Sequence, residues 1–403
     1  MRAIALALLL TLPLSLEAFD YTGDEALRRE AVLTVQTLKT HGFPEPGTVE
    51  LKEGTLTLVF DGETAHGALP ASGGTLVETL IGAELAFWGP SIPEPVSGAA
   101  RAYLAARTRG SEWAPRSLSD ALLQAFILEL VKNDPERLGG LWEAAGRGEP
   151  WGGMERYFAF QFGLSPEEFF ARSTARTLPH LRPFLDGIPS AAVHDGETEL
   201  VLPAAAPFSA SALDLRFPSA ADLGMTLAWG GGRLSCPGFL LVTYGPPLNH
   251  FDLVDLGSRV DDITLPLSGV ERVVFLATSP AFARTAVEPL SLRGSLTEAY
   301  PCRLEGLDLQ TDDEGATLTF TASSMRDVAA FVVLRENASR AGRLDPVGFL
   351  PGIGQAGDPF AFSLVDPEPP PAEEGALYHL YAITADGLMA HQGSLAMDAP
   401  ANP

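Results

Sequence analysis

Cysteine and histidine are scarce in this chain, and their scarcity excludes several kinds of site. Among 403 residues there are two cysteines and seven histidines. No two histidines lie within one helical turn of each other and none lies near a cysteine, so no metal-ligand spacing occurs. The G-x-S-x-G nucleophile elbow of many serine hydrolases does not occur either. We therefore predict that the protein uses no metal and no cofactor.

Basic residues are also few. The 51 acidic residues outnumber the 27 basic ones, which gives a formal net charge of −24. Such a field repels phosphate backbones and anionic membrane surfaces, so nucleic acid is excluded as a partner. Apolar residues make up 46% of the chain, which is enough for ordinary cores, and the length allows two or three domains.

Long apolar runs are absent except at the amino terminus. Ala3–Leu14 follows the basic start Met1-Arg2, is broken by Pro13, and is followed by the small residue Ala18. This pattern predicts a signal peptide over residues 1–18, with a retained amino-terminal anchor as the alternative. We expect an exported protein, periplasmic, at the cell surface or extracellular, with no transmembrane segment in the mature chain.

Helical periodicity is typical of the chain from about residue 24 to residue 177. The clearest signal is Ser165-Pro166-Glu167-Glu168, where serine caps a helix, proline starts it and Glu168 can close a capping box. Ser117-Leu118-Ser119-Asp120 predicts a second capped start. Val49–Leu51 and Thr55–Phe60 predict a short hairpin. Further helices are predicted at Asp24–Thr40, Leu76–Trp88, Val96–Arg107, Pro135–Ala145 and Met154–Phe162.

After about Pro183 the pattern changes to short alternating or apolar runs separated by glycine and proline turns. This pattern is typical of all-β sandwiches or jelly rolls. The strands of a first block are predicted at Leu200–Leu202, Ala212–Phe217, Thr226–Trp229, Gly238–Thr243, Ile263–Leu267 and Val270–Thr278. A second block, from about Leu304, includes predicted strands at Ala316–Ala322, Val328–Glu336, Phe360–Val365 and Leu377–Thr384.

The two cysteines, Cys236 and Cys302, fall in what we predict to be neighbouring β domains. Export makes a disulfide between them possible, and such a bridge would staple the domain junction. Two unpaired buried thiols are the alternative, and the sequence leaves both open.

The helical region resembles secreted gluzincin-type (peptidase MA-like) metallopeptidases. The resemblance is carried by Asp134–Trp142 and by Phe162–Phe169, which match the family's last helices. In that family, upstream helices carry H-E-x-x-H and a third zinc ligand. The best placement of those elements here is Val77–Ile81 and Pro93–Tyr103. No histidine occurs between Gly74 and Arg107.

This placement implies a family member without its zinc site. Only Glu78 would coincide with the general base and Tyr103 with the family's tyrosine, so these two are remnant site candidates. The histidine positions hold Val77 and Ile81, and the third ligand position holds Gly98. The resemblance therefore implies a pseudoenzyme with no catalytic residues, and leans against enzymatic activity.

The β blocks carry resemblances of their own. The last block resembles a fibronectin type III-like domain on Val332–Arg335, Phe362–Asp366 and Tyr378–Gly387. The block before it resembles the jelly-roll modules that follow some secreted metallopeptidases. We predict a multidomain fold, with a mainly helical α+β metallopeptidase-like N-terminal domain (19–186) followed by two all-β sandwich domains (187–300 and 301–403).

Three functions are consistent with this sequence. The leading hypothesis is an exported non-catalytic protein that binds a protein or peptide, with Val77, Ile81 and Ala100 forming an apolar plug. An active secreted hydrolase with an unrecognised site is one alternative. Glycan or cell-envelope binding through the β-sandwich modules is another, and it predicts an exposed aromatic patch on the β half. Trp113 and Trp151 are further exposed aromatic residues that could line a groove.

Overall fold

The structure is a computed structural model, and its residues form two compact units, one reaching Phe184 and the other beginning at Leu185 apart from short segments. The residues it describes are 20–52, 55–60, 63–68, 76–90, 92–146, 150–177, 180, 183–202, 210–218, 223–229, 238–256, 262–278, 290–298, 300–312, 315–325, 327–337, 343–352, 359–371 and 375–397.

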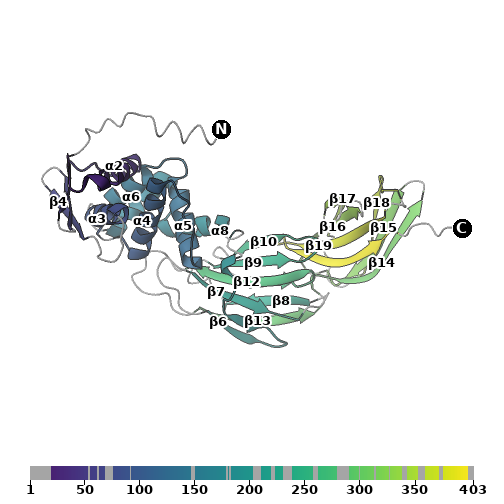
Figure 1. The fold of residues 1–403 in the computed structure, drawn as a ribbon. Helices are drawn as coiled ribbons and strands as arrows, with labels where there is room; N and C mark the ends of the chain where they lie inside the picture. Colours follow the sequence, from purple (N-terminus) through teal and green to yellow (C-terminus); the bar gives the residue numbers. More distant parts are fainter. Residues whose placement is uncertain are drawn as a thin grey trace. The chain divides into compact units, whose positions relative to one another are not determined.

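The first unit combines helices with a four-stranded sheet (Figure 1). Its helices are α2 (Glu25–Thr40), α3 (Leu76–Trp88), α4 (Glu94–Arg109), α5 (Leu118–Val131), α6 (Arg137–Gly146), α7 (Pro150–Phe162) and α8 (Pro166–Thr177). The sheet has the order β1 (Asp20–Thr22), β2 (Thr48–Lys52), β3 (Thr55–Phe60) and β4 (Glu63–Ala68). Only the β1–β2 pair is parallel.

Both predicted helix caps are confirmed. Ser165 Oγ accepts from the Glu168 amide at 3.1 Å, and Glu168 Oε2 accepts from the Ser165 amide at 2.9 Å, which closes the capping box of α8. Ser117 Oγ accepts from the Asp120 amide at 3.1 Å and fixes the start of α5. These local bonds satisfy amide groups that a helix leaves without internal partners.

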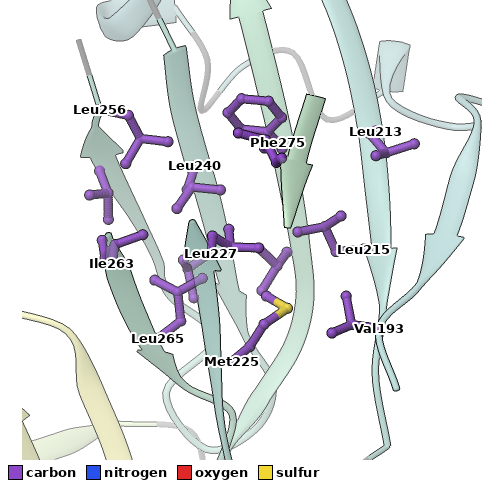
Figure 2. Close-up of a cluster of buried hydrophobic side chains, with 14 of the residues drawn as sticks. Val193, Leu213, Leu215, Met225, Leu227, Leu240, Leu256, Ile263, Leu265 and Phe275 are labelled. Carbon is purple, nitrogen blue, oxygen red and sulfur yellow. The ribbon is translucent and has the colours of Figure 1, made fainter. Parts of the chain in front are cut away.

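The second unit begins with a two-sheet β-sandwich. Its first sheet has the order β10 (Phe251–Asp255), β9 (Gly238–Tyr244), β12 (Val270–Thr278), β7 (Ala210–Arg216) and β5 (Ser190–Ala192). The second has the order β11 (Ile263–Pro266), β8 (Leu223–Ala228), β13 (Leu290–Glu298) and β6 (Thr198–Leu202). Leu227, Leu240 and Phe275 point into the core between the sheets, where all three are fully buried (Figure 2).

A second sandwich follows, with all its strand pairs antiparallel. One sheet has the order β14 (Arg303–Asp312), β15 (Gly315–Ser323) and β18 (Phe360–Asp366). The other has the order β17 (Leu344–Pro351), β16 (Val328–Asn337), β19 (Ala376–Thr384) and β20 (Met389–Ala396). The rings of Phe320, Phe331 and Phe362 pack against one another in its core, with ring centroids 4.9–5.0 Å apart.

The predicted fold class is wrong. The residues that the structure describes are predominantly β, with 45% of them in strands and 31% in helices, and they include only seven helices. The sequence underestimated strand content because several strands lack alternating apolar residues. Strand β4 contains glycine, and Ala65 is the one buried residue among those of its side chains that the structure describes; β17 contains two prolines and a glycine.

Cys302 is only 1% exposed, and its Sγ lies 3.2 Å from Gln392 Oε1. Cys236 lies outside the described residues, so its pairing with Cys302 stays a prediction. Within the described part of the chain, none of the helices combines the length and the apolar character needed to cross a membrane.

Candidate functional site: a groove along helix α4

Two hollows of the first unit lie along one face of α4. Two overlapping cavities, of about 530 and 600 Å³, are lined by α4 and by the segment that follows it. We call them together the α4 groove. Both are lined by Glu94, Gly98, Ala102, Trp113, Ala114 and Arg116. Cavities of this size are typical of small-molecule and saccharide sites.

The sequence of α4 explains why the groove is open. Gly98, Ala102 and Ala106 follow one another at four-residue spacing, so they share one face of the helix and leave space above it. Gly110 then ends the helix in a left-handed conformation (φ +64°), and the Ser111 amide donates to Ala106 O at 2.9 Å. This reversal brings residues 111–116 to the wall opposite the small residues.

Trp113 is held in that wall by its backbone. Gln124 Nε2 donates to the carbonyl oxygen of Trp113, and the Arg116 amide donates to Asp120 Oδ2 at 3.2 Å. The Trp113 ring lies 6.4 Å from the ring of Tyr103 and is tilted by 57° against it. The groove therefore has an aromatic wall whose position is fixed by α4 and α5 together.

Charged side chains of both signs surround this aromatic wall. Arg109 Nη2 lies 3.0 Å from Glu78 Oε1, and Arg101 Nη2 lies 3.4 Å from Glu94 Oε1. Their side chains are 39–78% exposed, so each ion pair stabilises the unit by about 1 kcal/mol or less. Among the described residues, the guanidinium of Arg116 has no ion-pair partner.

Of the residues that the sequence singled out, Glu78 and Gly98 line the α4 groove. Tyr103 does not, because it is 7% exposed and its hydroxyl lies 3.1 Å from Nε2 of His41. Burial lowers the pKa of His41 and raises that of Tyr103. The two remnant candidates therefore do not form one site.

The remaining singled-out positions are structural. Val77, Ile81 and Ala100 are at most 3% exposed and belong to the core between helices rather than to a cleft. No group of three or more histidine, cysteine or acidic residues in the described part of the chain is placed to hold a metal ion. The side chain of Trp151 lies outside the described residues.

Sequence reasoning identified Trp113 as a groove residue but missed the arginines beside it. Arg101, Arg109 and Arg116 fall within 16 positions of a chain that is otherwise poor in basic residues. That local density was the available signal. It could not show that the three side chains lie around one hollow, because the reversal at Gly110 places them there.

The second unit has a smaller hollow and two exposed aromatic residues. The hollow, of about 500 Å³, is lined by residues that include His194, Asp195, Arg216 and Phe217. Elsewhere, on β17 and β18, Phe349 is 65% exposed and Phe360 is 42% exposed. The glycan-binding alternative predicts an exposed aromatic patch on the β half, and that prediction is not tested by the exposure of these two residues alone.

A polar cluster lies on the sheet that contains β19 and β20. Ser394 Oγ lies 2.7 Å from Nδ1 of His379 and 2.9 Å from Nε2 of His391. Nε2 of His379 lies 3.4 Å from Glu336 Oε2, but not in hydrogen-bonding geometry. Burial lowers the pKa of both histidines, which keeps their rings neutral near pH 7.

Comparisons with known proteins assign no family. No family model and no curated protein matches the chain. A glycoside hydrolase domain of Endo-D from Streptococcus pneumoniae is 8% identical over 51% of this chain and 33% of its own, with a TM-score of 0.18. A β-1,2-glucanase from Parabacteroides distasonis is 11% identical over 53% and 39% of the two chains, with a TM-score of 0.16.

A segment of two fibronectin type III domains from chicken tenascin is 12% identical over 50% of this chain and 95% of its own, with a TM-score of 0.18. The chain thus spans well under half the length of the two hydrolase structures. Similarity at this level carries no argument about ligand or activity.

The resemblance to gluzincin metallopeptidases is wrong. The similar solved structures reported above are glycoside hydrolases and a fibronectin segment, and none is a metallopeptidase. The physical reason is that the resemblance rested on helix lengths and caps, which many helical folds share. The pseudoenzyme interpretation falls with it, since the apolar residues at Val77 and Ile81 are ordinary core.

Proposed function

We propose that this protein is an exported glycan-binding protein and that the α4 groove holds the saccharide. The observation that carries the proposal is Trp113, an aromatic wall flanked by arginine and glutamate side chains over a floor of glycine and alanine. A sugar ring presents apolar C–H faces and a rim of hydroxyls. An aromatic side chain packs against such faces, and charged groups accept and donate hydrogen bonds to the rim.

The proposal is tested with the full mature chain, residues 19–403, by calorimetric titration with cell-wall and plant oligosaccharides. Trp113→Ala is expected to weaken binding at least tenfold while leaving the circular dichroism spectrum unchanged. Phe349→Ala is the matched control, because it removes an exposed aromatic residue from the second unit. Loss of binding in Phe349→Ala, with Trp113→Ala unaffected, would move the site to the β-sandwich modules. If the protein binds none of the saccharides, the proposed function is wrong.

A hydrolase is the second candidate, favoured by the series Ser394, His379 and Glu336. In such a site His379 Nδ1 would take the hydroxyl proton as Ser394 Oγ attacks an ester carbonyl, and the alkoxide would leave with that proton. A fluorophosphonate probe tests this, because phosphonylation of Ser394 with loss of fluoride adds a fixed mass to its peptide. Absence of labelling, or equal labelling in His379→Gln, argues against the hydrolase.

A further inference from the structure

The charges around the α4 groove are balanced in a chain that is strongly acidic. The cavity of about 530 Å³ is lined by three arginines and three glutamates, Glu78, Glu94 and Glu112 among them. The chain as a whole carries −24. An anionic ligand would therefore approach through a repulsive field and find no net positive charge in the groove.

We infer that the ligand of the α4 groove is a neutral saccharide rather than an acidic one. This inference deepens the function proposed above and rests on it. Charged side chains, some of which also form ion pairs with one another, make hydrogen bonds to the hydroxyl groups of the saccharide. The apolar face of the saccharide packs on Trp113.

Arg101 lines the α4 groove. It lies against Gly82 of α3, whose missing side chain leaves the guanidinium 3.7–3.9 Å from where a Cβ would be. Nη2 reaches Glu94 Oε1, and Glu94 Oε2 accepts from Ser97 Oγ at 3.0 Å. The Nε of Arg101 is buried and has no hydrogen-bond partner among the described residues. Because Nε itself is buried, a ligand hydroxyl contacts Arg101 through the rest of its side chain, which is 41% exposed overall.

Donors and acceptors outside these ion pairs also line the α4 groove. Arg116 and Glu112 both line it, and neither side chain has a hydrogen bond or ion pair with another described residue. One offers donors and the other acceptors, at positions four apart in the segment that also carries Trp113. A polyhydroxylated neutral ligand uses both kinds of group, whereas a carboxylate uses only the donors.

The floor of the α4 groove suits a saccharide better than a polypeptide. Peptide-binding sites mostly use a free strand edge, a hydrophobic helix groove or an aromatic proline groove. Here the floor is the side of a helix whose amide groups are bonded within the helix, and its residues are Gly98, Ala102 and Ala106. Side chains alone supply the polar contacts, which suits hydroxyls better than a peptide backbone.

The test titrates the full mature chain with cellohexaose, laminarihexaose and mannohexaose, and with hexagalacturonate as the acidic probe. Each neutral hexasaccharide that binds is expected to bind at least tenfold more tightly than hexagalacturonate. Raising sodium chloride from 0.05 to 0.5 M is expected to change its dissociation constant less than twofold. Arg101→Gln should weaken neutral binding about fivefold, and Arg172→Gln, which removes an exposed arginine of α8, should not.

The possible outcomes distinguish a failure of the inference that the ligand is neutral from a failure of the proposed glycan binding. If hexagalacturonate binds more tightly, loses affinity steeply with salt and depends on Arg116, the inference is overturned while glycan binding stands. If no saccharide binds but reduced, carboxymethylated lactalbumin binds in a Trp113-dependent way, the groove takes polypeptide, and both proposals fail. Circular dichroism of each variant identifies any loss that comes from misfolding.

Discussion

The buried carboxyl group of Glu84 makes the helical unit sensitive to alkaline pH. Glu84 lies on α3 and is 0% exposed. Its Oε1 accepts from Trp88 Nε1 at 3.1 Å, and its Oε2 has no partner among the described residues. Burial raises the pKa of this carboxyl to about 8, and the Trp88 hydrogen bond offsets only part of the shift.

The direction of the pH dependence follows from the pKa of Glu84 in the folded and the unfolded protein. The folded unit keeps Glu84 protonated up to about pH 8, whereas the unfolded chain releases this proton near pH 4.5. The contribution to stability is therefore fully present below pH 4.5 and is lost as the pH rises towards 8. Each pH unit between these values costs about 1.4 kcal/mol, so the whole window costs about 5 kcal/mol.

We predict that the Glu84→Gln variant is less stable to unfolding than the parent protein at the acidic end of this pH range and more stable at its alkaline end. At pH 5 the variant is expected to be less stable by about 1 kcal/mol, since the buried amide NH2 lacks an acceptor. At pH 8 it is expected to be more stable by about 3 kcal/mol, because it has no proton to lose.

Urea unfolding followed by tryptophan fluorescence at several pH values measures this. Four of the five tryptophans, at positions 88, 113, 142 and 151, belong to the helical unit, so the signal reports on it. Glu78→Gln, on the same helix but half-exposed, corrects for the general loss of a negative charge. Parallel stability curves for the parent and Glu84→Gln would refute the reasoning.

Three further predictions concern the second unit. Asp366→Asn should destabilise the last sandwich by about 3 kcal/mol in urea unfolding, because buried Asp366 accepts from Tyr378 at 2.8 Å and from Arg335 at 2.6 Å; an unchanged midpoint would contradict this. His379→Gln should lower the pH at which the protein unfolds in acid. Burial lowers the pKa of His379, which faces Glu336, His391 and Ser394, so the contribution of its neutral ring to stability is lost as the pH falls below 6.5. An unshifted acid midpoint would argue against this. Cys302 should resist a thiol reagent at pH 8 until the chain unfolds, because burial raises its pKa to about 12, and rapid labelling of the native protein would show otherwise.

The sequence could predict the elements that local chemistry specifies. The caps at Ser117 and Ser165 are short-range bonds between neighbouring residues, so their residue types alone identify the starts of α5 and α8. Strands such as β9 and β12 are almost continuously apolar and are bounded by turns, so they were predicted as well.

Strands that depend on their partners could not be predicted. Strand β17 contains two prolines and Gly348, and it is a strand because it pairs with β16 at the edge of a sheet. Strand β4 likewise takes its form from its pairing with β3. For such segments the ladder of backbone hydrogen bonds outweighs the weak preference of the side chains.

By itself, the sequence determined the charge, the helix starts and the absence of paired metal ligands. Only the tertiary structure decided that Glu78 faces a groove while Tyr103 packs against His41, and that Trp113 stands among three arginines. The physical reason is that a groove is made by the space between elements. Its composition depends on where Gly110 turns the chain and on how α3, α4 and α5 pack, which no local pattern in the sequence specifies.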